Sequence, residues 1–90
     1  MRFEWDENKA AKNLKKHGIG FADAIEVFDD FNAVDSPDES HSENEIRFII
    51  IGLCGKNLIF VVFTEVGFDA IRLISARRTT KFEEKIYVNK

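Results

Sequence analysis

The sequence contains few of the residues that cross-link or restrain a small chain. Among its 90 residues there are one cysteine, one proline, one methionine and two histidines. Cys54 has no second cysteine with which to form an internal disulfide, and there is no cysteine cluster for zinc. This usage is typical of a reducing compartment, and we predict a cytoplasmic protein. Histidine, cysteine and carboxylate residues are not grouped at metal-ligand spacing, so we predict neither a metal site nor a cofactor.

Long apolar runs are also missing. The longest, Leu58 to Phe63, is far too short to span a bilayer. The first residues are charged and lead into a helix pattern, which differs from the pattern of a signal peptide. The chain also has no glycine-rich phosphate loop and no nucleophile elbow. We therefore expect no membrane partner, and these two kinds of catalytic motif are excluded.

The chain does have apolar bulk and an uneven distribution of charge. Nine phenylalanines supply much of the volume of a modest core, and the length predicts a single domain, residues 1–90. The formal net charge is −3, but residues 1–45 carry 5 Lys/Arg against 12 Asp/Glu, whereas residues 46–90 carry 8 against 4. A surface for nucleic acid is therefore expected in the second half of the chain.

Local patterns predict an α+β fold, with a twisted, mainly antiparallel sheet flanked by helices. Asp6 is suited to the N-cap of a first helix and Gly18 to the position after its end. Three consecutive apolar runs separated by turns predict an antiparallel meander. The expected strands are residues 1–5, 31–35, 45–53, 58–65 and 70–76. The expected helices are residues 6–17, 21–28 and 81–88, the last capped by Thr79 or Thr80, and residues 36–44 are expected to form a mobile loop.

The segment Ile71–Arg78 is an apolar strand that contains one arginine and ends in two more. Alternation predicts Ile71, Leu73 and Ser75 on one face and Arg72, Ile74 and Ala76 on the other. An arginine within such a run needs an anionic partner, and the planar guanidinium matches the oxygens of phosphate. The strand is therefore expected to carry cations to a phosphate site.

This segment belongs to an ordered set of residues that resembles the BrnT-type toxins, over nearly the whole chain. The set comprises Phe3–Ala10, Asn13, Lys16–Gly18, Phe21, Ala24, Val27–Phe28, Glu45, Arg47–Phe48, Ile51–Gly52, Thr64–Glu65 and Ile71–Arg78. The resemblance implies a RelE-like fold and a ribonuclease toxin of a type II toxin–antitoxin pair. It also implies a cognate BrnA-like antitoxin of the ribbon-helix-helix type, RNA as substrate, contact with DNA only through the antitoxin, and a dimer within a toxin–antitoxin heterotetramer.

RNA cleavage without a metal needs a base for the 2′-hydroxyl, cations for the pentavalent phosphate and an acid for the leaving 5′-oxygen. Glu65 is one candidate for the base, and His17 and Lys16 at the end of the first helix are two others. Arg72 and Arg77 are candidate phosphate ligands and electrostatic leaving-group acids. Arg47 and Arg78 are expected to extend the patch as RNA-binding residues.

Each of these residues also has a purely structural interpretation. Glu65 suits a surface ion pair with Arg72 or Arg47, and Arg72 suits neutralisation by Glu65 or Glu45. Arg77 and Arg78 fit a solvated strand end, and Lys16 and His17 fit a helix C-terminus, where cations are favoured. Phe68 at a turn tip is expected to be exposed, and there it suits stacking on a base or contact with a partner.

The chain departs from the family pattern at Val66. Members of the family often carry an arginine directly after the glutamate that corresponds to Glu65. The alternative hypothesis is therefore a catalytically weakened toxin homologue that acts as an antitoxin-binding or dimerisation module.

Overall fold

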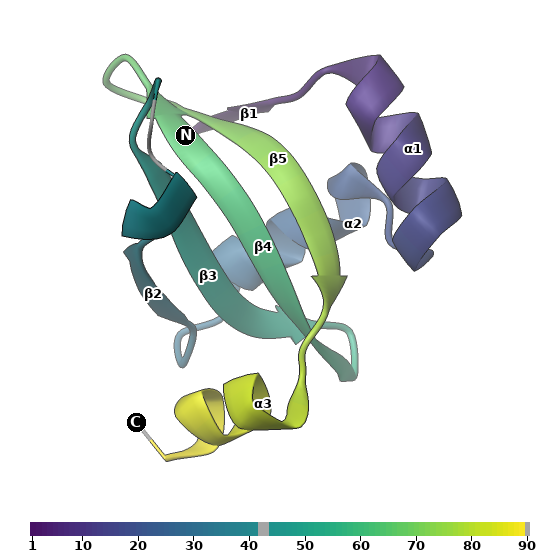
Figure 1. The fold of residues 1–90 in the computed structure, drawn as a ribbon, viewed down its shortest axis with the longest axis vertical. Coiled ribbons are helices and arrows are strands. Elements are labelled where there is room, and N and C mark those ends of the chain that lie inside the picture. The colour runs from purple at the N-terminus through teal and green to yellow at the C-terminus, as the bar shows by residue number, and fades with distance from the viewer. Residues whose placement is uncertain (42–43, 90) are drawn as a thin grey trace.

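The computed structural model describes residues 1–41 and 44–89 and has an α+β fold built on one sheet (Figure 1). In chain order the elements are β1 (Arg2–Glu4), α1 (Glu7–His17), α2 (Phe21–Ala24), η1 (Ile25–Asp29), β2 (Val34–Pro37), η2 (Glu39–His41), β3 (Arg47–Cys54), β4 (Asn57–Val66), β5 (Ala70–Arg78) and α3 (Lys81–Val88), where η marks a 3-10 helix. None of the helices in the described residues has the length and apolar character that a membrane crossing requires.

The five strands lie in the order β1-β5-β4-β3-β2. Strands β3, β4 and β5 form the predicted antiparallel meander, and β2 adds to its edge in antiparallel orientation. Only β1, among the described strands, pairs in parallel, because α1, α2 and η1 separate it from the rest of the sheet in the chain. The predicted fold class, a mainly antiparallel sheet with helices against it, is confirmed.

Several predicted boundaries need correction. The second helix is α-helical only to Ala24 and continues as the 3-10 helix η1, so it is not one regular helix over residues 21–28. The edge strand lies at Val34–Pro37 and includes two residues of the predicted loop, because they pair with β3. Residues 42–43 of that loop lie outside the described residues. Thr80, and not Thr79, caps α3, and Glu83 completes a capping box.

One face of the sheet is covered by α1, α2 and η1, and we call it the covered face (Figure 1). The segment formed by α2 and η1 supplies Phe21, Ala24 and Val27, which are buried against the sheet. The strand residues of this core are Ile50, Ile59, Val61, Phe63, Ile71, Leu73 and Ala76. In the described part of the chain, no α-helix lies over the centre of the opposite face; η2 lies along one side of it and α3 lies beyond the end of β5. We call it the open face.

Asn13 joins α1 to the part of β5 that β1 does not reach. β1 pairs with β5 only as far as Arg72, so the backbone of Ala76 has no neighbouring strand on that side. The Asn13 side-chain amide donates to the Ala76 carbonyl at 2.8 Å, and its oxygen accepts from the Ala76 N–H at 3.1 Å. The same amide nitrogen donates to the Ile19 carbonyl at 3.1 Å. The buried Asn13 side chain thus satisfies the backbone N–H and C=O of Ala76, which would otherwise need a neighbouring strand.

β5 contains one more residue than β4 between two paired positions. Val62 pairs with Ser75, whereas the next residue, Phe63, pairs with Leu73. Ile74 is therefore the extra residue of a β-bulge. A bulge of this kind reverses the alternation of side chains beyond it.

The bulge changes which residues of β5 share a face. Ala76 lies in the core on the covered face, and Ser75 lies opposite Val62 on the open face, so the predicted placement of these two residues is wrong. Arg77 pairs with Phe60, which is also on the open face. Arg72 and Arg77 are five residues apart and would point to opposite faces in a regular strand. The bulge brings them to the same one.

Candidate active site

The open face holds a depression between η2 and β5, which we call the central depression. Its volume is about 430 Å³. It is lined by Asp38, Ser40, Arg47, Ile49, Phe60, Val62, Ile74, Ser75 and Arg77. Two guanidinium groups, two hydroxyl groups and one carboxylate thus surround an apolar floor. The two arginines come from β3 and β5. Arg47 pairs with Thr64 of β4 and Arg77 pairs with Phe60 of β4, so the two arginines lie four residues apart along β4.

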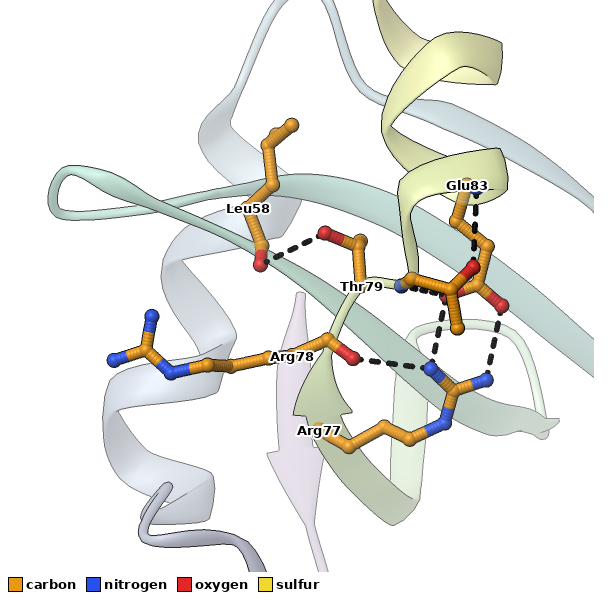
Figure 2. Close-up of polar contacts among 6 residues, drawn as sticks. Leu58, Arg77, Arg78, Thr79 and Glu83 are labelled. Atoms are coloured by element: carbon orange, nitrogen blue, oxygen red, sulfur yellow. Dashed lines mark hydrogen bonds and ion pairs between the residues drawn. The ribbon is translucent and has the colours of Figure 1, made fainter.

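Arg77 is held in place by α3 (Figure 2). Its Nη1 and Nη2 atoms donate to Oε1 and Oε2 of Glu83, each at 2.9 Å, and Nη1 also donates to the Arg78 carbonyl at 3.0 Å. The guanidinium carbon lies 4.0 Å from the centre of the Phe60 ring, in the range of a cation–π contact. Four contacts therefore fix the position of this arginine at the edge of the central depression.

The pair changes the titration of both partners. The hydrogen bonds to Glu83 raise the pKa of Arg77, so this guanidinium stays protonated. The same hydrogen bonds lower the pKa of Glu83, helped by the Thr80 backbone N–H, which donates to Oε1 at 2.8 Å. Glu83 therefore performs two tasks: it completes the cap of α3 and it binds Arg77 in a bidentate pair, with only 14% of its side chain exposed.

Arg47 lies on the other side of the central depression. Its Nε atom is 3.6 Å from Oε1 of Glu45. Glu45 in turn lines a second depression, of about 460 Å³, at the end of the sheet where β4 turns into β5. We call this the rim depression. It is lined by Glu45, Ile46, Phe48, Thr64, Glu65, Val66, Gly67 and Arg72.

The rim depression brings together Arg72 and Glu65, but not as an ion pair. Arg72 donates from Nε to Oε2 of Glu4 at 3.1 Å, so its partner is on β1 and is neither Glu65 nor Glu45, the partners that the sequence suggested. Glu65 lies opposite Ile71, a residue of the core, so register directs its exposed side chain toward the covered face. Arg72 lies opposite Thr64 and belongs to the open face.

The remaining predicted site residues lie on the covered side. Lys16 and His17 belong to the last turn of α1, before the left-handed Gly18, where their charges suit the helix C-terminus. Arg78 leaves β5 in the direction opposite to Arg77 (Figure 2), and its Nη1 donates to the Asn57 side chain at 2.8 Å. It lines a separate cavity of about 260 Å³ with Gly18 and others. The structure therefore groups Arg47 with Arg77 and Arg72 with Glu65, and separates all four from Lys16, His17 and Arg78.

Sequence reasoning missed three residues of this region. Asp38 reaches the central depression because η2 lies along the open face, which no local pattern indicates. Ser75 reaches it because of the bulge at Ile74. Glu83 reaches Arg77 because α3 folds back at the end of β5, which no local pattern indicates. Among the described residues, no three or more His, Cys, Asp or Glu side chains are grouped so that they could hold a metal ion.

Comparisons with known proteins identify the family to which this site belongs. The model of the family described as "Ribonuclease toxin, BrnT, of type II toxin-antitoxin system" matches residues 5–83. The chain belongs to the BrnT family. It is also similar to the crystal structure of the Brucella abortus ribonuclease toxin BrnT, with 35% sequence identity and a TM-score of 0.73. That match covers 90% of this chain and 99% of the other. A search of curated proteins found no match.

Membership of the BrnT family gives the two depressions a functional context. The chain is a ribonuclease toxin of the type II toxin–antitoxin class, and an antitoxin is its expected partner. The family match spans β3, β4 and β5, which carry Arg47, Glu65, Arg72 and Arg77, and it ends at Glu83. All of the residues that line the central and rim depressions therefore lie within the matched region.

Proposed function

We propose that this BrnT-family toxin cleaves single-stranded RNA in its central depression by metal-independent acid/base chemistry. The observation that carries the proposal is the pair of arginines, Arg47 and Arg77, on opposite sides of one depression on the open face. Two guanidiniums supply in fixed positions the positive charge that a bound cation would otherwise provide at a phosphate.

The reaction follows from what those groups can do. The ribose 2′-oxygen attacks the adjacent phosphorus while a base takes its proton, and the bond from phosphorus to the 5′-oxygen of the next nucleotide breaks. The leaving 5′-oxygen, whose developing charge an arginine stabilises, takes its proton from water. The products are a 2′,3′-cyclic phosphate and a free 5′-hydroxyl. Arg77 stabilises the extra negative charge on the pentavalent phosphate, since its contacts with Glu83 and Phe60 hold the guanidinium where that charge develops. Arg47, on β3, provides a second guanidinium contact to the same phosphate.

The base must lie within hydrogen-bond reach of the 2′-hydroxyl. Asp38 lines the same depression as Arg77, so it becomes our first candidate for this role. Glu65 remains a candidate through the rim depression, which it shares with Arg72. Lys16 and His17 would have to act from the covered side, and their positions give them little support as bases. Val66 lines the rim depression, so the absence of an arginine at this position leaves the cations of the central depression in place.

The partner that we propose is a BrnA-like ribbon-helix-helix antitoxin that masks the open face. DNA is then contacted by the antitoxin, and the toxin is present as a dimer within a heterotetramer. The family description supports a toxin–antitoxin pair. An antitoxin that covers Arg47 and Arg77 would prevent these arginines from contacting a phosphate of the RNA, without changing the fold.

The test is cleavage of a defined RNA by purified protein in the presence of EDTA, with analysis of the product ends. We expect cleavage in EDTA and 2′,3′-cyclic phosphate ends. Arg77→Ala should lower the rate about 30- to 1000-fold, because losing a charged contact to a transition state is worth roughly 2–4 kcal/mol. Activity lost in chelator and restored by magnesium would contradict the proposed mechanism.

Arg78→Ala is the matched control for this experiment. Arg78 is adjacent to Arg77 and is also at the strand end, but its side chain leaves toward the covered side. We expect Arg78→Ala to keep most of the activity. Equal losses in both variants would show that cleavage depends on general charge and not on the open face. A folded parent protein that cleaves no RNA would favour the alternative of a weakened, antitoxin-binding homologue.

A further inference from the structure

Exposed apolar side chains gather at the end of the sheet beside the rim depression. Phe68, in the turn between β4 and β5, has an exposed fraction of 108%, and Met1 and Ile46 have exposed fractions of 83% and 66%. The backbone segments that carry these three residues lie at the same end of the sheet. The Arg2 N–H, directly after Met1, donates to the Asp69 carbonyl at 2.7 Å, and Ile46 lines the rim depression.

The turn presents the Phe68 ring away from the core. Gly67 has a φ of 63°, a left-handed conformation that suits glycine, and it lines the rim depression directly before Phe68. Folding buries none of this ring, so the fold gains no hydrophobic stabilisation from it. A single exposed apolar residue is ordinary. Here the ring follows directly after Gly67, which lines a depression that also includes Arg72, and this is a more specific arrangement.

The groups that line the rim depression suit a nucleotide. Its volume of about 460 Å³ is within the range of small-molecule sites. Arg72 provides a guanidinium for a phosphate, and the carboxylate of Glu45 can accept hydrogen bonds from the amino group of a base. Single-stranded RNA is bound in proteins by stacking of unpaired bases on exposed aromatic rings.

The linings of the rim depression and the central depression meet at an ion pair. Glu45 lines the first and Arg47 lines the second, and these two residues approach each other to 3.6 Å. Arg72 and Arg77 lie on the same face of β5, about 13–16 Å apart along the strand. A single strand of RNA that crosses the open face would therefore place phosphates of non-adjacent nucleotides beside the two arginines.

We propose that the rim depression is a second nucleotide subsite, in which Phe68 stacks on a base that flanks the cleaved bond and Arg72 contacts the phosphate of that nucleotide. The proposal rests on the proposed function, since it assumes that RNA lies across the open face. It assigns Phe68 to substrate positioning and gives it no part in the chemical step.

Phe31 provides a matched control for Phe68. It is also a phenylalanine in a turn and has an exposed fraction of 99%, but it lies between η1 and β2. Its chain neighbours Asp30 and Asn32 line neither depression, whereas Gly67 beside Phe68 lines the rim depression. Because both rings are exposed, substitutions at either position should leave the fold intact. Phe68→Ala should raise KM about 5- to 150-fold with kcat retained, the effect of losing one base–aromatic stack, and Phe31→Ala should change neither. Phe68→Tyr should behave like the parent and Phe68→Leu like Phe68→Ala.

Binding is measured separately with an oligonucleotide that contains 2′-fluoro groups and cannot be cleaved. In Phe68→Trp, stacking of a base should quench the fluorescence of the new indole, whereas Phe31→Trp should show no change beyond that of the parent. This measurement tests the subsite even if the protein proves inactive as a nuclease. Unchanged KM in Phe68→Ala together with no quenching in Phe68→Trp would overturn the proposal. So would weaker antitoxin binding in Phe68→Ala with RNA binding unchanged, because the ring would then belong to a protein interface.

Discussion

Two carboxylates, Asp38 and Glu65, lie beside arginines in this molecule, and their surroundings differ. Asp38 is in the central depression with Arg77, and its side chain accepts from the Ser40 hydroxyl at 3.0 Å. Glu65 is at the end of β4, exposed, with its register partner Ile71 in the core. A base acts only from within hydrogen-bond reach of its proton. The site geometry therefore ranks Asp38 before Glu65.

We predict that Asp38→Asn lowers kcat for RNA cleavage about 10²- to 10⁴-fold, which is the usual contribution of a general base. The substitution keeps the size of the side chain and removes its ability to accept a proton. Glu65→Gln is the control, and it should stay within about threefold of the parent because its carboxylate is not in the central depression. The rates of both variants are measured from pH 5 to 9 at saturating RNA. A large loss in Glu65→Gln with Asp38→Asn unaffected would return the base to Glu65.

At the scale of elements, α3 depends on specific polar contacts. None of its residues is buried, and Phe82 and Val88 are largely exposed, so apolar packing contributes little to its position. Two side chains attach it to the sheet region: Glu83 binds Arg77, and the Tyr87 hydroxyl donates to Oδ2 of Asp30 at 2.8 Å. That hydrogen bond also raises the pKa of Tyr87, so its phenol stays neutral at physiological pH. Of these two contacts, the Glu83–Arg77 ion pair makes the position of α3 depend on pH.

We predict that α3 loosens in acid. The Arg77 hydrogen bonds lower the pKa of Glu83 below its ordinary value near 4.5, so ionised Glu83 stabilises the folded arrangement. That stabilisation is complete above the ordinary value and is lost as the pH falls through the lowered pKa. The expected loss is about 1–2 kcal/mol of local stability. It is measured from amide hydrogen exchange in α3 at several pH values, corrected for intrinsic exchange.

Glu83→Gln isolates the ion pair, because glutamine still completes a capping box with Thr80. In this variant α3 should exchange faster at neutral pH and lose its acid dependence. Glu84→Gln, one residue further along and exposed, is the control and should behave like the parent. The same acid dependence in Glu83→Gln as in the parent would mean that another group controls α3.

Most elements of this fold were predictable because their signals are local. Asp6 and Gly18 bound α1 as expected, with the Asp6 carboxylate accepting from the Lys9 N–H at 2.9 Å. The meander followed from apolar runs and turns. The bulge at Ile74 was not predictable, since it depends on how β4 and β5 fit together over the core. The change from α2 to η1 has no local signal either. η1 packs closely on β3: a Cβ atom at Gly52 would lie 3.2 Å from the Cβ atom of Val27.

At the scale of the whole molecule, the structure separates the arginines that the sequence predicted for one site. The sequence showed a basic second half, and three of its arginines, Arg47, Arg72 and Arg77, do share the open face. Arg78 does not, because adjacent residues of a strand point to opposite faces. The bulge set the faces of Arg77 and Arg78 relative to Arg72, and the path of η2 brought Asp38 to the central depression. Neither is encoded in local periodicity, so the catalytic roles of all these residues stay predictions.

This arrangement predicts a measurable salt dependence for an acidic protein that binds RNA. If Arg47, Arg72 and Arg77 each neutralise one phosphate, the logarithm of the RNA association constant should fall with the logarithm of salt concentration with a slope of about −2, since each contact on a single strand contributes about −0.7. The net charge of −3 would by itself predict no attraction. Binding of a labelled, non-cleavable 2′-fluoro oligonucleotide is measured by anisotropy between about 50 and 200 mM salt. Arg77→Ala should reduce the slope by about 0.7, whereas Arg78→Ala should leave it unchanged. Equal reductions in both variants, or a slope near zero in the parent, would mean that RNA does not follow the open face.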